Sequence, residues 1–436
     1  MITSVRFCRP LTLSKRIIVG VKRSSTMPSL PQPDLPAPAH PTVDSMLSRK
    51  FGKEVANYFS GSPLNRVSFL RNDHTFLSSA LKHPSSIFLA FNGVEPLLNS
   101  PSEFARLSFE DVKPVIGENP FERPEEDMIA QYNSSLYLPQ IIFLGLDERK
   151  DGLVYREHYK GQPWFAVDVT PKESVKEAAE KVVEKLTSRG FEFSKSMRQM
   201  HLVAEEAAIY AEARHLLDWN ARNPFCASCG YKTLSVNAGF KRTCPPKDIA
   251  SAVSNAGERP PCATRTGISN LCFPRTDPTV IMAVVSADGQ RMLLGRQKRW
   301  PPYWYSTLAG FLEPAESVEE AVRREVWEES GIHLGRVVIH STQPWPFPAN
   351  LMIGAIGQAL PTGETVHLGH DAELEDARWF SAEEVREGLR VGTSALGEAA
   401  GPKYKEGGLR LPPSTAIANQ LITAIMNGFA SGTPMI

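Results

Sequence analysis

The chain has neither an excess of one charge sign nor a long apolar run. Among its 436 residues, 48 are Lys or Arg and 48 are Asp or Glu. This balance removes the electrostatic argument for nucleic acid or an acidic membrane as the main partner. A stretch of about 18 uncharged apolar residues, which a transmembrane helix needs, is also lacking. We therefore expect no membrane partner.

Cysteine is scarce, and the six residues present are unevenly placed. Four of them fall between positions 226 and 262, within 37 residues. This spacing is unlike the disulfide framework of a small secreted protein. In an intracellular chain such clustering favours a metal site.

The N-terminal segment lacks acidic residues. Its first 33 residues carry six basic side chains, namely Arg6, Arg9, Lys15, Arg16, Lys22 and Arg23. Such a composition is typical of a mitochondrial presequence. We favour a disordered tail, or a true start at Met27, over a presequence. Residues 28–41 are proline-rich and are not expected to join a packed core, so we assign residues 1–43 to a basic, proline-rich tail.

Residues 44–223 are predicted to form an N-terminal α/β domain, with order beginning near Asp44. Short runs rich in β-forming residues predict strands at 87–91, 141–144 and 164–167. Helical spacing of apolar residues predicts helices at 172–189, ended by Gly190, and at 197–219. This half contains no recognisable catalytic constellation, so a structural or substrate-positioning role is expected.

Residues 277–430 show a different order of elements. Composition predicts strands at 280–285, 292–294, 337–339 and 351–356, with a helix at 317–330. This order predicts an α/β domain with a mixed sheet.

The residues between these halves, 224–276, carry the clustered cysteines. Cys226 and Cys229 are two residues apart and followed by Gly230, a spacing that grips one face of a tetrahedral ion. Cys244 follows after fourteen residues. The fourth ligand is either Cys262 or Cys272; we favour Cys262, because Cys272 lies between Leu271 and Phe273 and resembles a buried apolar residue. One structural Zn²⁺ per chain is predicted.

The segment from Gly310 to Ile332 carries acidic residues in a helical pattern. Ser317 and Glu320 have the spacing of a capping box, and Gly331 ends the helix. Glu325, Glu328 and Glu329 then share one face. Carboxylates about 5 Å apart repel by roughly 3 kcal/mol per pair at an effective dielectric constant of about 20. Divalent cations would relieve this repulsion, and oxygen-only ligands favour Mg²⁺ or Mn²⁺.

This segment resembles the Nudix box at every defined position, listed as Gly310, Glu316, Arg324, Glu325, Val326, Glu328, Glu329, Gly331 and Ile332. The resemblance implies an α/β/α sandwich and hydrolysis of a diphosphate bond. It also implies that Glu325 and Glu329 bind the metal, that Glu328 is a ligand or the base that activates water, and that Arg324 orients the glutamates.

A proline-aromatic run follows the box. It consists of Gln343, Pro344, Trp345, Pro346, Phe347 and Pro348, and its alternation predicts a stiff segment that can stack a planar ring. The run resembles a signature of the NADH pyrophosphatase subfamily, with Asn350 where that signature has serine. Phe273 stands where the subfamily often has tyrosine.

The subfamily resemblance implies further assignments. The ribbon cysteines map onto Cys226, Cys229, Cys244 and Cys262, although the insert before Cys262 is longer than usual. Glu373 matches a further metal ligand, Ala309 a metal-binding backbone carbonyl, and Ala418 a substrate contact. The resemblance also implies a degenerate Nudix-like N-terminal domain and a homodimer.

Three functions are compatible with these features. The first is Mg²⁺-dependent hydrolysis of NADH, and less readily NAD⁺, to the nicotinamide mononucleotide and AMP. The second is removal of a NAD cap from RNA 5′ ends by the same site. The third is a catalytically silent zinc-ribbon interaction module, which the intact glutamates disfavour. The expected compartment is the cytoplasm or peroxisome, with the mitochondrion as the alternative.

Overall fold

The computed structural model describes residues 32–37, 54–196, 198–251, 257–266, 270–314, 316–370 and 373–429. The basic N-terminal side chains, Met27 and Asp44 lie outside these ranges. The expectations for the tail, the start site and the beginning of order therefore stay predictions. Within the described ranges, no helix has both the length and the apolar character that crossing a bilayer requires.

The N-terminal half is built on a mixed sheet in the order β3-β2-β1-β6-β4, with β5 paired to β6 and β7 to β2. Its strands are β1 (Ile87–Asn92), β2 (Glu95–Ser100), β3 (Glu103–Phe104), β4 (Ile141–Asp147), β5 (Leu153–Tyr155), β6 (Tyr159–Asp168) and β7 (Glu192–Phe193). Its helices are α2 (His74–Lys82), α3 (Phe109–Ile116), α4 (Glu125–Ala130), α5 (Lys176–Ser188) and α6 (Ala204–Arg222). The three predicted strands are confirmed as β1, β4 and β6.

Both faces of this sheet are covered, which explains its apolar strands. In β1, Phe88 and Ala90 belong to one core with residues of α2, α3 and α5. Leu89 and Phe91 belong to the opposite core, with residues of α6. Because neighbouring strand residues point to opposite faces, a strand between two helical layers is apolar at every position.

The two predicted helices form with shifted ends. The first is α5, which begins four residues later than expected because residues 173–175 form a 3₁₀ turn. The second, α6, begins at Ala204 rather than at 197. The backbone before it makes tertiary hydrogen bonds instead: the Leu202 carbonyl accepts from the Tyr58 hydroxyl, and the Val203 N–H donates to the Ser102 carbonyl.

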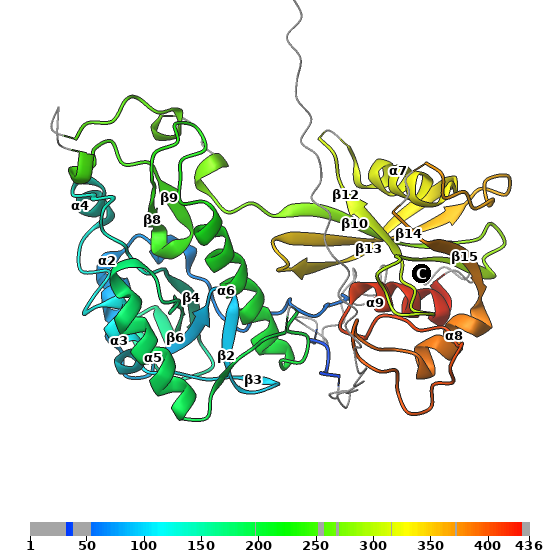
Figure 1. Cartoon of the computed structure of the whole chain (residues 1–436), viewed down its shortest axis with the longest axis horizontal. Helices are drawn as coiled ribbons and strands as arrows, with labels where there is room; N and C mark the ends of the chain where they lie inside the picture. Colours follow the sequence, from blue (N-terminus) through cyan, green and yellow to red (C-terminus); the bar gives the residue numbers. More distant parts are fainter. Residues whose placement is uncertain are drawn as a thin grey trace, which may run out of the picture.

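A two-stranded hairpin of β8 (Leu234–Val236) and β9 (Lys241–Thr243) follows α6 and carries the cysteine segment. In Figure 1 it lies at the upper end of the N-terminal lobe, away from the C-terminal lobe. Phe240 lies between these two strands, and its ring packs under the Arg71 guanidinium. The Arg71 Cζ atom is 3.3 Å from the centre of the Phe240 ring. The hairpin is thus attached to the N-terminal half.

The C-terminal half contains a second mixed sheet in the order β13-β14-β10-β11-β15, with β12 paired to β10. Its strands are β10 (Asp277–Val285), β11 (Arg291–Arg296), β12 (Leu308–Phe311), β13 (Leu334–Trp345), β14 (Asn350–Ala359) and β15 (Asp376–Ser381). Its helices are α7 (Val318–Ser330), α8 (Ala382–Val391) and α9 (Ile417–Ala424). Figure 1 shows α7 on one side of the sheet and α8 and α9 on the other.

The central strand β10 explains this sandwich. Val280, Met282 and Val284 share a core with α7 residues, whereas Ile281, Ala283 and Val285 share a core with α9. The expected α/β/α sandwich with a mixed sheet is confirmed. Strands β12 and β15 were not predicted, since their sequences have no strong β pattern and form strands only by pairing with β10 and β11.

Candidate active site and cysteine cluster

Helix α7 has the ends that its sequence predicts. The Ser317 hydroxyl accepts from the Glu320 N–H at 3.3 Å, and the Glu320 carboxylate accepts from the Ser317 N–H at 2.8 Å. Gly331 ends the helix at φ 72°, a left-handed conformation that favours glycine. Val322 and Val326 are fully buried against the sheet. Local capping and core packing therefore fix the helix that carries the glutamates.

Arg324 binds three glutamates at this helix through its guanidinium group. It donates to both oxygens of Glu316, at 2.6 and 2.9 Å, and to the Phe311 carbonyl at 2.8 Å. It also donates to Glu325 at 2.9 Å and to Glu328 at 2.8 Å. The hydrogen bonds from Arg324 to Glu316 lower the pKa of Glu316 to about 2. The predicted orienting role of Arg324 agrees with this geometry, but Glu316, to which no role had been given, is its bidentate partner.

Glu325 lies against the backbone at Gly310. A Cβ atom at position 310 would come 1.9 Å from the Glu325 Cδ, so only glycine leaves room for this carboxylate. Burial is the main cause of the raised pKa of Glu325; the charges of Glu328 and Glu373 add to it, and Arg324 opposes it. A bound cation would stabilise the charged carboxylate of Glu325 and so oppose this rise in its pKa.

The other predicted metal ligands lie around this point. Glu329 is buried on α7, and Ala309 precedes Gly310 on β12, opposite Ile281. In the described part of the chain, however, the ligand atoms of these carboxylates do not all lie within 4.8 Å of one another. The one group found there that meets this distance consists of cysteines. The glutamates Glu325 and Glu328 are turned toward Arg324 instead. The donor set, all oxygen, fits Mg²⁺ or Mn²⁺.

The proline-aromatic run lies between the two halves of the chain. The Phe59 ring makes edge contacts with both Trp345 and Phe347, at centroid distances of 6.0 and 5.8 Å. Arg198 lies over the Trp345 ring at 5.3 Å, and Arg214 over the Phe347 ring at 4.7 Å. Three of these five side chains come from the N-terminal half. Sequence spacing carries no signal for contacts between residues so far apart.

Gln343 connects three segments. It is fully buried, and its Nε2 donates to the carbonyls of Tyr58 and Thr415, each at 2.9 Å. Its Oε1 accepts from the Ile417 N–H at 2.9 Å. All of these bonds are to protein backbone, so the Gln343 amide ties β13 to the N-terminal half and to the start of α9.

The remaining predicted substrate residues are distributed around this seam. Asn350 donates to the Thr279 hydroxyl at 3.0 Å, and Ala418 is buried on α9 in the core below β10. Phe273 is exposed, with the Lys241 ammonium 5.5 Å from its ring. Pro344 is half-buried, Pro346 buried and Pro348 exposed. The structure therefore does not gather all these residues around one described pocket.

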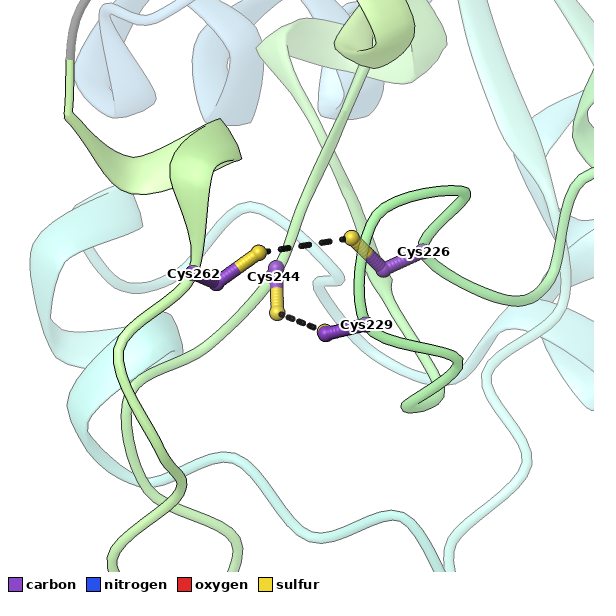
Figure 2. Close-up of side chains that lie close together, drawn as sticks. All are labelled: Cys226, Cys229, Cys244 and Cys262. Atoms are coloured by element: carbon purple, nitrogen blue, oxygen red, sulfur yellow. Dashed lines mark hydrogen bonds between the residues drawn. The ribbon is translucent and has the colours of Figure 1, made fainter.

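The four predicted zinc ligands form a compact cluster. The Sγ atoms of Cys226 and Cys262 lie 3.6 Å apart, and those of Cys229 and Cys244 3.5 Å apart (Figure 2). All four lie within 4.8 Å of one another. Tetrahedral Zn²⁺ with bonds of about 2.3 Å requires sulfur separations near 3.8 Å. The cluster is therefore compatible with zinc.

Two residues beside Cys262 were missed by the spacing argument. The Thr264 hydroxyl lies 3.1 Å from the Cys262 sulfur, and the Arg265 guanidinium donates to the Cys244 sulfur at 3.5 Å. Although burial acts in the opposite direction, hydrogen bonds from Thr264 lower the pKa of Cys262 to about 6. Donors of this kind stabilise the thiolate form that a metal needs.

We expect Cys262→Ser to lose the zinc and Cys272→Ser to keep it. Cys272 is buried outside the four-sulfur cluster, near the Thr264 carbonyl. Metal analysis of the purified variants by mass spectrometry measures this directly, with wild type as the one-zinc reference. Loss of zinc from the Cys272 variant alone would contradict the assignment.

Comparison with known proteins identifies both halves. The family described as NUDIX domain matches residues 275–396. The family described as NADH pyrophosphatase-like rudimentary NUDIX domain matches residues 85–219. The first match covers the glutamate helix and the proline-aromatic run, and the second covers the N-terminal sheet.

Curated relatives extend over most of the chain. It is 36% identical over 387 residues to NAD-capped RNA hydrolase NUDT12 of Homo sapiens, covering 85% of this chain and 73% of the relative. It is 34% identical over 374 residues to a NAD-capped RNA hydrolase of Schizosaccharomyces pombe, covering 85% and 92%. It is 32% identical over 269 residues to NAD(P)H pyrophosphatase NUDT13, mitochondrial, of Homo sapiens, covering 60% and 67%. This chain belongs to the Nudix hydrolase family, as a member in which an NADH pyrophosphatase-like Nudix domain precedes the Nudix domain.

Proposed function

We propose that the protein hydrolyses the diphosphate bond of a nicotinamide adenine dinucleotide, either free as NADH or as the cap of an RNA 5′ end. The observation that carries this proposal is the Arg324 cluster, in which one guanidinium holds Glu316, Glu325 and Glu328 beside Gly310. The names of the relatives support a NAD-type substrate, and they support the free and the RNA-linked forms equally.

The glutamates divide by exposure in a way that suits different roles. The Glu328 side chain is 36% exposed, whereas that of Glu325 is 14% exposed. A group that takes a proton from water needs access to solvent, so we assign Glu328 as the base. The more buried Glu325 and Glu329, with Glu373 and the Ala309 carbonyl, would hold Mg²⁺ or Mn²⁺, which neutralises diphosphate charge and lowers the pKa of water.

The reaction then requires few protein steps. Water adds to one phosphorus, the bond from that phosphorus to the bridging oxygen breaks, and Glu328 takes the proton released by the water. The leaving phosphate carries away the bridging oxygen. Arg324 holds the base in place throughout through its hydrogen bond to Glu328.

Product analysis tests the function. With Mg²⁺, NADH is expected to yield AMP and reduced nicotinamide mononucleotide in equal amounts, and NAD-capped RNA to yield nicotinamide mononucleotide and RNA with a 5′-monophosphate. Turnover rates at saturating concentrations of each substrate, measured by chromatography of the products, show which substrate is cleaved faster. Absence of metal-dependent cleavage of both substrates by folded protein would contradict the proposal.

We further propose that Trp345 and Phe347 set dinucleotide preference. Stacking a base on an aromatic ring is worth about 1–3 kcal/mol, so Phe347→Ala should weaken NADH binding by roughly tenfold or more. ADP-ribose, which has the same diphosphate but one base, should be affected little. Kinetic constants for the two substrates measure the difference.

The contact with Phe59 supplies the matched control for that experiment. Phe59→Ala removes a ring that packs on both aromatics from the N-terminal side. If Phe347 only packs the two halves together, both variants should change NADH and ADP-ribose kinetics alike. Selective loss of NADH binding in Phe347→Ala alone supports stacking.

The domain boundaries, the assembly and the compartment stay predictions. We propose the division into residues 44–223, 224–276 and 277–430, which agrees with the separate sheets. The homodimer rests on the family resemblance. One relative is named as mitochondrial, which keeps the mitochondrion beside the cytoplasm and peroxisome as the expected location.

A further inference from the structure

A cavity of about 540 Å³ lies where the cysteine hairpin packs on the N-terminal half. Its walls come from α4, the segment 131–140, the start of β4, the end of α6 and strand β8. It shares no lining residue with the predicted Nudix site. Its volume lies in the range of sites for small organic ligands.

The walls of this cavity are largely apolar and aromatic. The apolar and aromatic lining residues include Phe121, Met128, Tyr132, Tyr137 and Leu234 of β8. Burial raises the pKa of Tyr137 further above the neutral range, so its hydroxyl keeps its proton and can donate a hydrogen bond. Such surfaces suit a planar ring.

Three cations on the cavity wall form no ion pair with a described carboxylate. Arg242 is 8% exposed and donates to Thr233 and Asn220, which are neutral. Arg123 donates to the Gln131 amide. Lys232 donates to the Ser134 carbonyl at 3.3 Å.

Of the three acidic residues that line the cavity, Glu173 is exposed and the other two accept hydrogen bonds within the protein. Asp168 accepts from Lys172 at 3.0 Å and from the Thr170 N–H at 3.0 Å. Glu125 accepts from the Asn237 N–H. Arg123, Lys232 and Arg242 can therefore bind an anionic ligand. Arg side chains bind phosphate well.

One buried acceptor among the lining residues also lacks a donor in the described part of the chain. The Oε1 atom of Gln140 is buried and accepts no hydrogen bond from the described residues. A buried amide oxygen without a donor costs free energy that a ligand amino or hydroxyl group would recover.

We propose that this cavity is a second, noncatalytic binding site for a mononucleotide. The base would lie among Phe121, Tyr132 and Tyr137, with an amino or ribose hydroxyl group donating to Gln140. The phosphate would lie toward Arg123, Lys232 and Arg242. The required ligand features, a planar ring, hydrogen-bond donors and an anionic group, occur together in a mononucleotide.

Hydrogen–deuterium exchange with AMP, GMP, CMP, UMP and nicotinamide mononucleotide, without added Mg²⁺, locates the binding. We expect at least one of them at millimolar concentration to slow exchange in residues 120–140 and 232–242. The variant Arg123→Gln with Lys232→Gln should bind that nucleotide at least about tenfold more weakly by calorimetry, because both side chains are exposed and contribute charge rather than packing.

The matched control is Lys160→Gln with Lys181→Gln, which removes two exposed cations elsewhere in the same half. It should bind like wild type. Failure of all five nucleotides to bind, protection confined to residues 277–429, or equal affinity in the two double variants would each overturn the proposal. The NADH cleavage assay is independent of these outcomes.

Discussion

Replacing Glu328 by glutamine is expected to lower the turnover of NADH at least about a hundredfold while leaving the fold intact. Glutamine has nearly the same shape, but it cannot take a proton, and proton transfer by a positioned side chain commonly contributes roughly 10²–10⁴ in rate. Glu328 lies on α7 with a partly exposed carboxylate held by Arg324, so the substitution removes chemistry rather than core packing. Steady-state turnover with Mg²⁺ measures the effect.

The same helix provides a control for this substitution. Glu319→Gln removes a charge in the first turn of α7, and Glu319 is not one of the carboxylates that Arg324 binds. Its turnover should stay within a few-fold of wild type. A folded Glu328→Gln enzyme with near wild-type turnover would show that another group takes the proton.

Gly310→Ala is expected to reduce turnover by about a hundredfold with little loss of stability. The added methyl group would come 1.9 Å from the Glu325 Cδ, so the carboxylate must move. Because the displaced atoms end a flexible side chain, the fold can adapt at small cost. A displacement of about 1 Å in a reacting site can cost roughly 10²-fold in rate. Turnover and thermal unfolding, measured on the same preparation, separate the two effects.

Gly401→Ala is the matched control for the Gly310 substitution. A Cβ atom at position 401 would meet the Val391 carbonyl at 3.6 Å, an ordinary contact. Turnover and melting temperature should therefore stay near those of wild type. If Gly310→Ala kept full turnover, the position of Glu325 beside Gly310 would have no role in catalysis.

The sequence by itself determined the features that depend on neighbouring residues. The Ser317 and Glu320 capping box, the helix end at Gly331 and the common face of the glutamates all arise within about four turns of chain. Hydrogen-bond geometry and the helical period are local properties, so α7 forms as predicted. The continuous apolar run of β10 is likewise typical of a strand that is covered on both faces, as it is in the structure.

Tertiary structure alone decided the contacts between distant segments. The start of α6 depends on hydrogen bonds to Tyr58 and Ser102, which no helical pattern encodes. The rings of Trp345 and Phe347 meet Phe59, nearly three hundred residues earlier. Spacing left Cys262 and Cys272 as alternatives, and in the structure the Cys262 sulfur lies with the other three sulfurs. Such contacts depend on how whole sheets pack, because residue spacing along the chain says nothing about the distance between segments that are far apart in sequence.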